Sequence, residues 1–389
     1  MYNKHFNPNL RAGRAFFATL MLLMLTTDFA FGQTTKLCET LADVPITNTT
    51  IDVHTTTATL PNTVIPGINP NFQIKSATGR LILVGNMVTI TSKIVTFTNC
   101  DIRMAEGAGF IVPSGKILRF LNCRIAAHDC NKLWNTIKVE SGGFLSMTGN
   151  PGIEDALSVI TVSGTGTVFC ENNTLNRNYK GIDMKNSIKG YRYLIRGNTF
   201  SRDGDLIDES TVSKSSEIIA GINAENIGDL NLENNNFLGL SRGISLKNTI
   251  CNVTGGSFKN INPNMFGSPK SLLVGNGIFI SNNSKAKVSN VHGFDNCTYA
   301  GINVVGNGGS LDCQNSHFKN LGSFGIIANG EPNNFIENNI FSSNTNNTSN
   351  VLVVNNFSSL TSSYIGKNII NLSEGIEVSE DFSALHNKF

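Results

Sequence analysis

Residues Gly277 to Phe341 hold three consecutive segments with one pattern: GIFISNNSKAKVSNVHGF (277–294), GINVVGNGGSLDCQNSHF (301–318) and GIIANGEPNNFIENNIF (325–341). Each begins with Gly-Ile and a short alternating apolar run, passes through a polar Asn/Gly turn, and closes on an Asn-rich turn and a Phe. The first glycines of the segments are 24 residues apart. A period of this length indicates a repeat architecture, in which each unit buries its apolar face only against its neighbours.

The same rhythm begins near Leu81 and continues to the last Gly-Ile pair, Gly375-Ile376. Short apolar runs with Gly and Asn punctuation predict an all-β chain, because both residues tolerate positive φ in tight turns. The Leu/Asn consensus of leucine-rich repeats is absent, and propeller blades need about 40 residues. Three short strands within 22 to 25 residues therefore predict a parallel β-helix of about a dozen coils.

Equal coils stacked on one another place like residues over like residues. This predicts an internal file of apolar side chains, made of Leu175, Phe200, Phe237, Phe258, Phe294, Phe318, Phe341 and Ile370. It also predicts a ladder of turn asparagines, made of Asn173, Asn198, Asn235, Asn315 and Asn338. Such ladders close hydrogen bonds between identical side chains in neighbouring coils.

Units such as GINVVGNGG-SLDCQNSHF and ENNNF-x4-RGISL resemble the right-handed parallel β-helix repeat proteins of the pectin-lyase-like superfamily. More narrowly, they resemble the exported β-helix proteins of Bacteroidota-type bacteria. The resemblance covers residues 81–389 and implies a right-handed parallel β-helix there. It implies no single activity, since that superfamily contains lyases, hydrolases, epimerases, adhesins and inert spacers.

The N-terminus has the layout of a secretory signal peptide. Basic residues precede the apolar run Ala15 to Leu25, and small residues follow at Ala30-Phe31-Gly32, which predicts a signal peptide over 1–32. Residues 33–80 lack the repeat, and we expect them to form an N-terminal extension and cap. The mature chain is then expected to be secreted or at the cell surface, without a membrane span.

The charge balance of the chain argues against two classes of binding partner. The 30 Lys+Arg and 28 Asp+Glu nearly balance, which gives no electrostatic case for nucleic acid or an anionic membrane. We expect a monomer.

Cys100 and Cys123 both occur in Asn-Cys-x-Ile, one period apart. Cysteines at equivalent repeat positions predict buried thiols in a side-chain stack.

One acidic loop could hold a cation. The stretch SRDGDLIDES (201–210) carries Asp203, Asp205 and Asp208, and oxygen-rich loops with glycine can bind Ca²⁺. The alternative, which we favour, is a solvated acidic loop. No Cys/His spacing suits zinc.

Two insertions, 201–217 and 261–273, are long enough to form the walls of a groove. The first adjoins a run rich in basic and aromatic residues, from Arg177 to Arg202, which suits an acidic glycan because Arg pairs with carboxylates and Tyr stacks on sugar rings. We predict a ligand groove lined by Arg192, Arg196, Arg202 and Asp205. The alternative is that these cations simply occupy a solvated face.

No catalytic residues could be identified. Hydrolases of the resembling superfamily carry motifs similar to Asn-Thr-Asp, Asp-Asp and Gly-His-Gly, and none of these occurs here. The leading hypothesis is therefore an exported, non-catalytic β-helix protein that presents a lateral surface to glycans or to a cell surface. The alternative is a polysaccharide lyase or hydrolase with a divergent active site.

Overall fold

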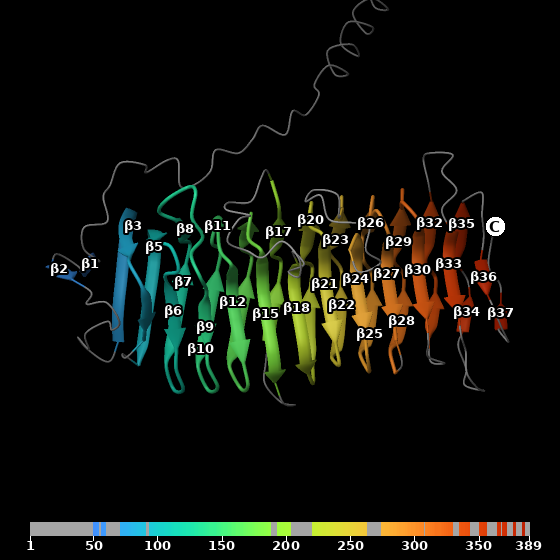
Figure 1. Cartoon of the computed structure of the whole chain (residues 1–389), viewed down its shortest axis with the longest axis horizontal. Coiled ribbons are helices and arrows are strands. Elements are labelled where there is room, and N and C mark those ends of the chain that lie inside the picture. Colours follow the sequence, from blue (N-terminus) through green and yellow to red (C-terminus); the bar gives the residue numbers. More distant parts are fainter. Residues whose placement is uncertain are drawn as a thin grey trace, which may run out of the picture. The chain divides into compact units, whose positions relative to one another are not determined.

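The computed structural model describes fourteen segments of the chain: residues 50–53, 56–59, 71–90, 93–187, 193–203, 220–262, 274–306, 308–329, 334–342, 350–355, 364–366, 368–371, 376–378 and 383–385. These residues form an all-β parallel solenoid and contain no helix (Figure 1). The predicted fold class is thereby confirmed, while its right-handed sense and its number of coils stay predictions. The proposed signal peptide lies outside the described residues.

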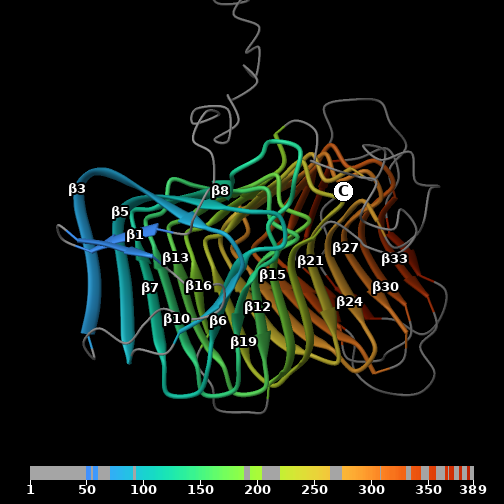
Figure 2. The ribbon, with the colours of Figure 1, turned by 60° about the vertical axis from the view of Figure 1, so that its left-hand side comes forward.

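One sheet receives a single strand from each coil, and all of its pairings are parallel. This 12-stranded sheet runs in chain order through β4 (Met87–Thr89), β6 (Gly109–Val112), β9 (Ile137–Val139), β12 (Ser158–Ser163), β15 (Lys180–Ser187), β18 (Ala220–Ile227), β21 (Arg242–Lys247), β24 (Asn276–Ser281), β27 (Ala300–Val305), β30 (Phe324–Asn329), β33 (Asn350–Asn355) and β36 (Ile376–Val378). Figure 2 shows these strands side by side in successive coils.

A second, 23-stranded sheet begins with two long strands, β3 (Asn71–Val84) and β5 (Ile94–Met104). Each later coil adds two strands, the first at least as long as the second: β7 (Ile117–Leu121), β8 (Arg124–Ala127), β10 (Phe144–Thr148), β11 (Gly152–Glu154), β13 (Thr167–Glu171), β14 (Thr174–Asn176), β16 (Tyr193–Arg196), β17 (Thr199–Ser201), β19 (Leu230–Glu233), β20 (Asn236–Leu238), β22 (Ile250–Thr254), β23 (Ser257–Lys259), β25 (Lys285–Ser289), β26 (Gly293–Asp295), β28 (Ser310–Gln314), β29 (His317–Lys319), β31 (Phe335–Glu337), β32 (Ile340–Ser342), β34 (Tyr364–Gly366), β35 (Ile369–Asn371) and, for the last coil, β37 (Ser383–Leu385) alone. An antiparallel hairpin, β1 (Thr50–Val53) and β2 (Thr56–Thr59), forms a separate two-stranded sheet.

The predicted apolar file is confirmed by the pairing register. Leu175 pairs with Phe200, each following Phe lies opposite the next, and Phe341 pairs with Ile370. Neighbouring rings are stacked nearly parallel, with centroids 4.6 to 5.0 Å apart. This separation matches the spacing of paired strands, so the backbone ladder itself sets the ring stacking.

The Gly of each Gly-Ile pair lies against this file. A Cβ built on Gly243 would lie 2.6 Å from a ring carbon of Phe258 and 2.5 Å from the backbone oxygen of Gly277. Gly181, Gly221 and Gly301 meet the rings of their own coils in the same way. Glycine therefore recurs at this position because the phenylalanine ring occupies the space that a side chain would need.

A ladder of buried asparagines runs beside the rings. Asn150, Asn173 and Asn198 each donate a side-chain N–H to the next amide oxygen in the series, which ends at Asn235, over 2.7 to 3.0 Å. The prediction is confirmed for Asn173, Asn198 and Asn235.

The ladder prediction is wrong for Asn315 and Asn338. Both residues have positive φ, 51° and 54°, and form the corner just before the buried position. Ser316 and Asn339 occupy the buried position instead, and the Ser316 N–H donates to Asn339 Oδ1 at 2.9 Å. Asparagine is favoured at the corner for a different reason, its tolerance of left-handed backbone.

Six of the seven described cysteines are free and buried, which confirms the predicted buried thiols: Cys100, Cys123, Cys170, Cys251, Cys297 and Cys313. Burial raises the pKa of the Cys170 thiol to about 12 and raises the pKa of the Cys251 thiol further. Cys130, by contrast, is disulfide-bonded.

We expect these thiols to resist alkylation in the folded protein, because the thiolate is the reactive form. At any pH below the raised pKa, little of each thiol is present as thiolate. Iodoacetamide at mildly alkaline pH should label the six only after denaturation. A peptide map without reductant should find Cys130 in a disulfide and identify its partner. Fast labelling of any of the six in the native protein would contradict this assignment.

Candidate functional site

Three consecutive strands of the 12-stranded sheet, β15, β18 and β21, present a regular set of polar side chains, which we call the polar grid. Its inner row is Asp183, Asn223 and Ser245, its middle row is Lys185, Glu225 and Lys247, and its corner row is Asn186, Asn226 and Asn248. The residues that alternate with the first two rows along the strand, such as Ile222 and Ala224, are fully buried in the core. Alternation along each strand therefore places the grid on the outer face.

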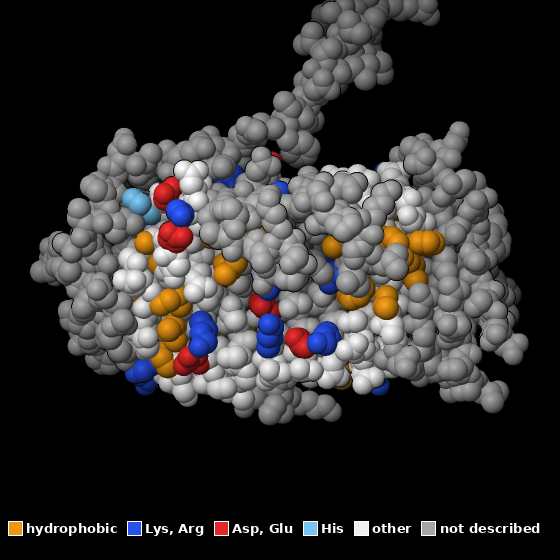
Figure 3. Space-filling model, viewed as in Figure 1, with side chains coloured by type: hydrophobic (Ala, Val, Ile, Leu, Met, Phe, Trp, Pro, Cys, Tyr) orange, Lys and Arg blue, Asp and Glu red, His pale blue; other side chains and the backbone are white. Residues whose placement is uncertain are grey.

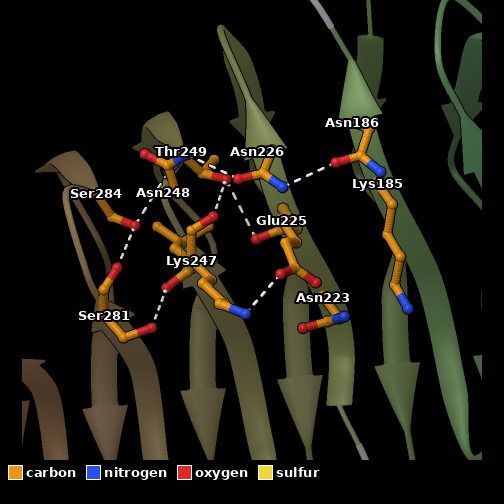
Figure 4. Close-up of polar contacts among 12 residues, drawn as sticks. Lys185, Asn186, Asn223, Glu225, Asn226, Lys247, Asn248, Thr249, Ser281 and Ser284 are labelled. Carbon is orange, nitrogen blue, oxygen red and sulfur yellow. Dashed lines mark hydrogen bonds and ion pairs between the residues drawn. The ribbon is translucent and has the colours of Figure 1, made fainter.

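Most grid residues bond to their counterpart one coil away (Figure 4). Asn223 Nδ2 donates to Asp183 Oδ1 at 2.8 Å, and Lys247 Nζ lies 2.6 Å from Glu225 Oε1. The hydrogen bond from Lys247 lowers the pKa of Glu225, and the positive charges of Lys247 and Lys185 act in the same direction. The carboxylate of Glu225 is thus held ionised between two lysines.

The corner row is a second, exposed asparagine ladder. Asn226 Nδ2 donates to Asn186 Oδ1 at 2.8 Å, and Asn248 Nδ2 donates to Asn226 Oδ1 at 2.7 Å. All three residues have positive φ, which turns the chain out of the sheet. A primary amide has two N–H donors and an oxygen with two lone pairs. In Asn226 the ladder uses one of those donors and one lone pair, so capacity for a ligand is left.

Asp183 lies at the inner edge of the grid, where the surface is less open. Its side chain is 9% exposed, and its Oδ2 lies 3.6 Å from Lys180 Nζ and 3.8 Å from Lys185 Nζ. Exposure rises from this row to the exposed corner asparagines. The grid therefore offers carboxylate, amide and ammonium groups at different depths.

The predicted groove residues do not all fall within the described segments. Arg192 and Asp205 lie outside them, as do nearly all of the insertions 201–217 and 261–273. Arg196, at the end of β16, is exposed on the 23-stranded sheet, and its Nη2 lies 2.6 Å from Glu171 Oε1. Arg202 is buried just after β17.

For the predicted Ca²⁺ site, only Asp203 is described. Its backbone N–H donates to Asn176 Oδ1 at 3.0 Å. Asp208 lies outside the described residues, as does Asp205. Within the described segments no group of three or more His, Cys, Asp or Glu side chains could hold a metal ion.

The other described members of the basic and aromatic run are buried in the core or pair with carboxylates. Arg177 is buried and forms ion pairs with Glu154 and Asp155. Tyr179 and Tyr193 are buried as well. Among the described arginines of the run, Arg196 is exposed, and it already pairs with Glu171.

The sequence analysis missed the polar grid, although a signal was present. The three strands read GIDMKN (181–186), GINAEN (221–226) and GISLKN (243–248). In each, the third and fifth residues are polar, so alternation after the Gly-Ile pair would have placed these two on one face. The sixth is Asn, which favours the positive φ of a corner.

The described part of the chain contains no helix long and apolar enough to cross a membrane. Comparison of the chain with protein-family models, with curated proteins and with solved structures finds no match.

Proposed function

We propose that this chain is an exported, non-catalytic β-helix protein of the pectin-lyase-like type, which binds polysaccharide or cell-surface glycan on the outer face of its 12-stranded sheet. The observation that carries the proposal is the polar grid. Sugar hydroxyls both donate and accept hydrogen bonds, and the grid presents donors and acceptors of three kinds. The apolar run near the N-terminus, preceded by basic residues, supports export.

A rigid, repeating surface suits a repeating ligand. Neighbouring residues within each row are held about 4.8 Å apart by the strand pairing. Bonds such as Lys247–Glu225 and Asn226–Asn186 already orient the side chains before any ligand arrives. Preorganisation of this kind lowers the entropy lost on binding, so several weak sugar contacts can add up to measurable affinity.

We expect the purified protein to bind at least one polysaccharide, and Asn226→Ala and Lys185→Ala to weaken that binding by up to about tenfold each, the effect of losing a hydrogen bond worth about 1.4 kcal/mol. Affinity electrophoresis or calorimetry would measure the change. Lys287→Ala is the matched control, because Lys287 is equally exposed and pairs with Asp312 on the other sheet. Loss of binding in the control, or no effect in the grid variants, would place the site elsewhere.

A polysaccharide lyase or hydrolase remains the second candidate, favoured by the two carboxylates of the grid, Asp183 and Glu225, with Lys180 and Lys185 beside them. Acid and base groups on adjacent strands are the minimum for such chemistry. Incubation with acidic and neutral polysaccharides should give no cleavage above a heat-killed control. Cleavage that disappears in Asp183→Asn would establish the enzyme instead.

A further inference from the structure

We infer that the glycan bound by the polar grid is a neutral polysaccharide and not a polyanion; this inference rests on the proposed function. A surface that attracts a polyanion needs an excess of positive charge, which raises both affinity and salt dependence. The described lysines of this face instead each lie beside a carboxylate before any ligand binds, and Arg242 of β21 is buried with its guanidinium 4.1 Å from the centroid of the Phe279 ring.

Each described lysine of β9, β15 and β21 lies within 4.0 Å of a carboxylate. Lys138 Nζ is 3.1 Å from Glu140 Oε1, and Lys247 Nζ is 2.6 Å from Glu225 Oε1. Lys180 and Lys185 share Asp183, at 3.6 and 3.8 Å. Figure 3 shows positive and negative side chains interspersed on the face that it presents. An acidic sugar would have to compete with carboxylates that already hold the lysines.

The run that first suggested an acidic ligand points the same way. Arg177 and Arg202 are buried, and the exposed Arg196 is bonded to Glu171 through both Nε, at 2.8 Å, and Nη2, at 2.6 Å. The described cations of this run therefore form no open basic patch. Compensated pairs still have free donor and acceptor positions, which uncharged hydroxyls can use without displacing an ion pair.

Partly exposed aromatic residues occur farther along the same sheet. Tyr299 directly precedes β27 and Phe324 begins β30, and their rings meet edge to face with centroids 5.5 Å apart. Figure 3 shows hydrophobic side chains gathered on this face beyond the charged ones. Aromatic rings pack against the C–H face of a pyranose, which gives a neutral sugar chain a second kind of contact.

The test compares neutral polysaccharides (β-glucan, galactomannan and xyloglucan) with acidic ones (polygalacturonate, alginate and chondroitin sulfate), by calorimetry at low and at physiological salt. We expect binding to a neutral polymer that hardly changes with salt, and no binding to the acidic polymers. Tyr299→Ala should weaken neutral binding by up to about tenfold. Preferential binding of an acidic polymer, falling steeply with salt, would overturn the inference and leave the proposed function standing. Binding to none of the six polymers would count against the proposed function itself.

A variant that removes one negative charge from the polar grid provides a second test. Glu225→Gln keeps the shape of the side chain but leaves Lys185 and Lys247 without their shared negative neighbour. We expect it to gain salt-sensitive binding to polygalacturonate, which the unaltered protein is not expected to bind. Glu106→Gln is the matched control, since it removes the same charge from an exposed pair with Lys132, away from the grid. Equal gains in both variants, or none in Glu225→Gln, would show that charge compensation on the grid does not set the preference.

Discussion

Gly243→Ala should destabilise the folded protein by about 1 to 3 kcal/mol, the usual range for an added methyl group in a packed core. The new Cβ would lie 2.5 Å from the backbone oxygen of Gly277 and 2.6 Å from the ring of Phe258, so at least one of them must move. Neither moves easily, because Phe258 is held between two stacked rings at 4.7 Å. Chemical denaturation monitored by circular dichroism would measure the loss.

Gly293→Ala is the matched control for this substitution. Gly293 also lies in a strand of the solenoid and is buried, yet a Cβ there would meet no heavy atom within 4 Å. We expect its effect to stay within about 0.5 kcal/mol. Similar losses at both positions would show that any change at a strand glycine is harmful, and that the ring contact is not the cause.

A double-mutant cycle isolates the contact between the Gly row and the Phe file. Phe258→Ala alone should cost about 3 to 5 kcal/mol, because it leaves a cavity in the ring stack. With the ring absent, the methyl group of Gly243→Ala should cost little, so the double variant should be clearly more stable than the sum of the single losses predicts. Simple additivity would contradict the packing described here.

Asn198→Ala is expected to cost about 3 kcal/mol or more, because its amide links three coils in the core. Its Nδ2 donates to Cys170 O at 2.8 Å and to Asn235 Oδ1 at 3.0 Å, while its Oδ1 accepts from Asn173. Alanine would leave several of these buried groups without a partner, at about 1 to 3 kcal/mol each. Denaturant unfolding would measure the difference.

The exposed ladder provides the comparison. Asn226 makes the same amide-to-amide bonds one coil apart, but water can replace a lost partner there. We expect Asn226→Ala to cost only about 1 to 2 kcal/mol, the cost of placing alanine in left-handed backbone. If both alanine variants lost stability equally, burial of the amide would not be the factor that gives the inner ladder its strength.

Much of the fold could be read from the chain alone, because its signals are local and repeated. The interval from Phe294 to Phe318 equals the length of one coil, so stacking of the rings follows from any solenoid with that period. Alternation along a strand likewise determines which residues point inward.

The positions of adjacent asparagines could not be predicted from the sequence alone. In Asn172-Asn173 and Asn338-Asn339, two identical side chains occupy very different positions: the first has positive φ at the corner and the second is buried in the ladder. Local preference suits Asn at both places. The choice between them depends on the carbonyl and amide groups of the neighbouring coils, which only the folded chain brings into reach.

The polar grid shows the same division between local pattern and folded context. The polar, outward character of Lys185, Glu225 and Lys247 can be read from each strand by itself. Their pairing cannot, since the coil that starts at Gly181 is followed by an insertion before the next begins at Gly221. Backbone pairing between β15 and β18 sets which side chains meet. The tertiary structure alone decided that Lys247 neutralises Glu225, because these partners lie a whole coil apart along the chain and one strand apart in space.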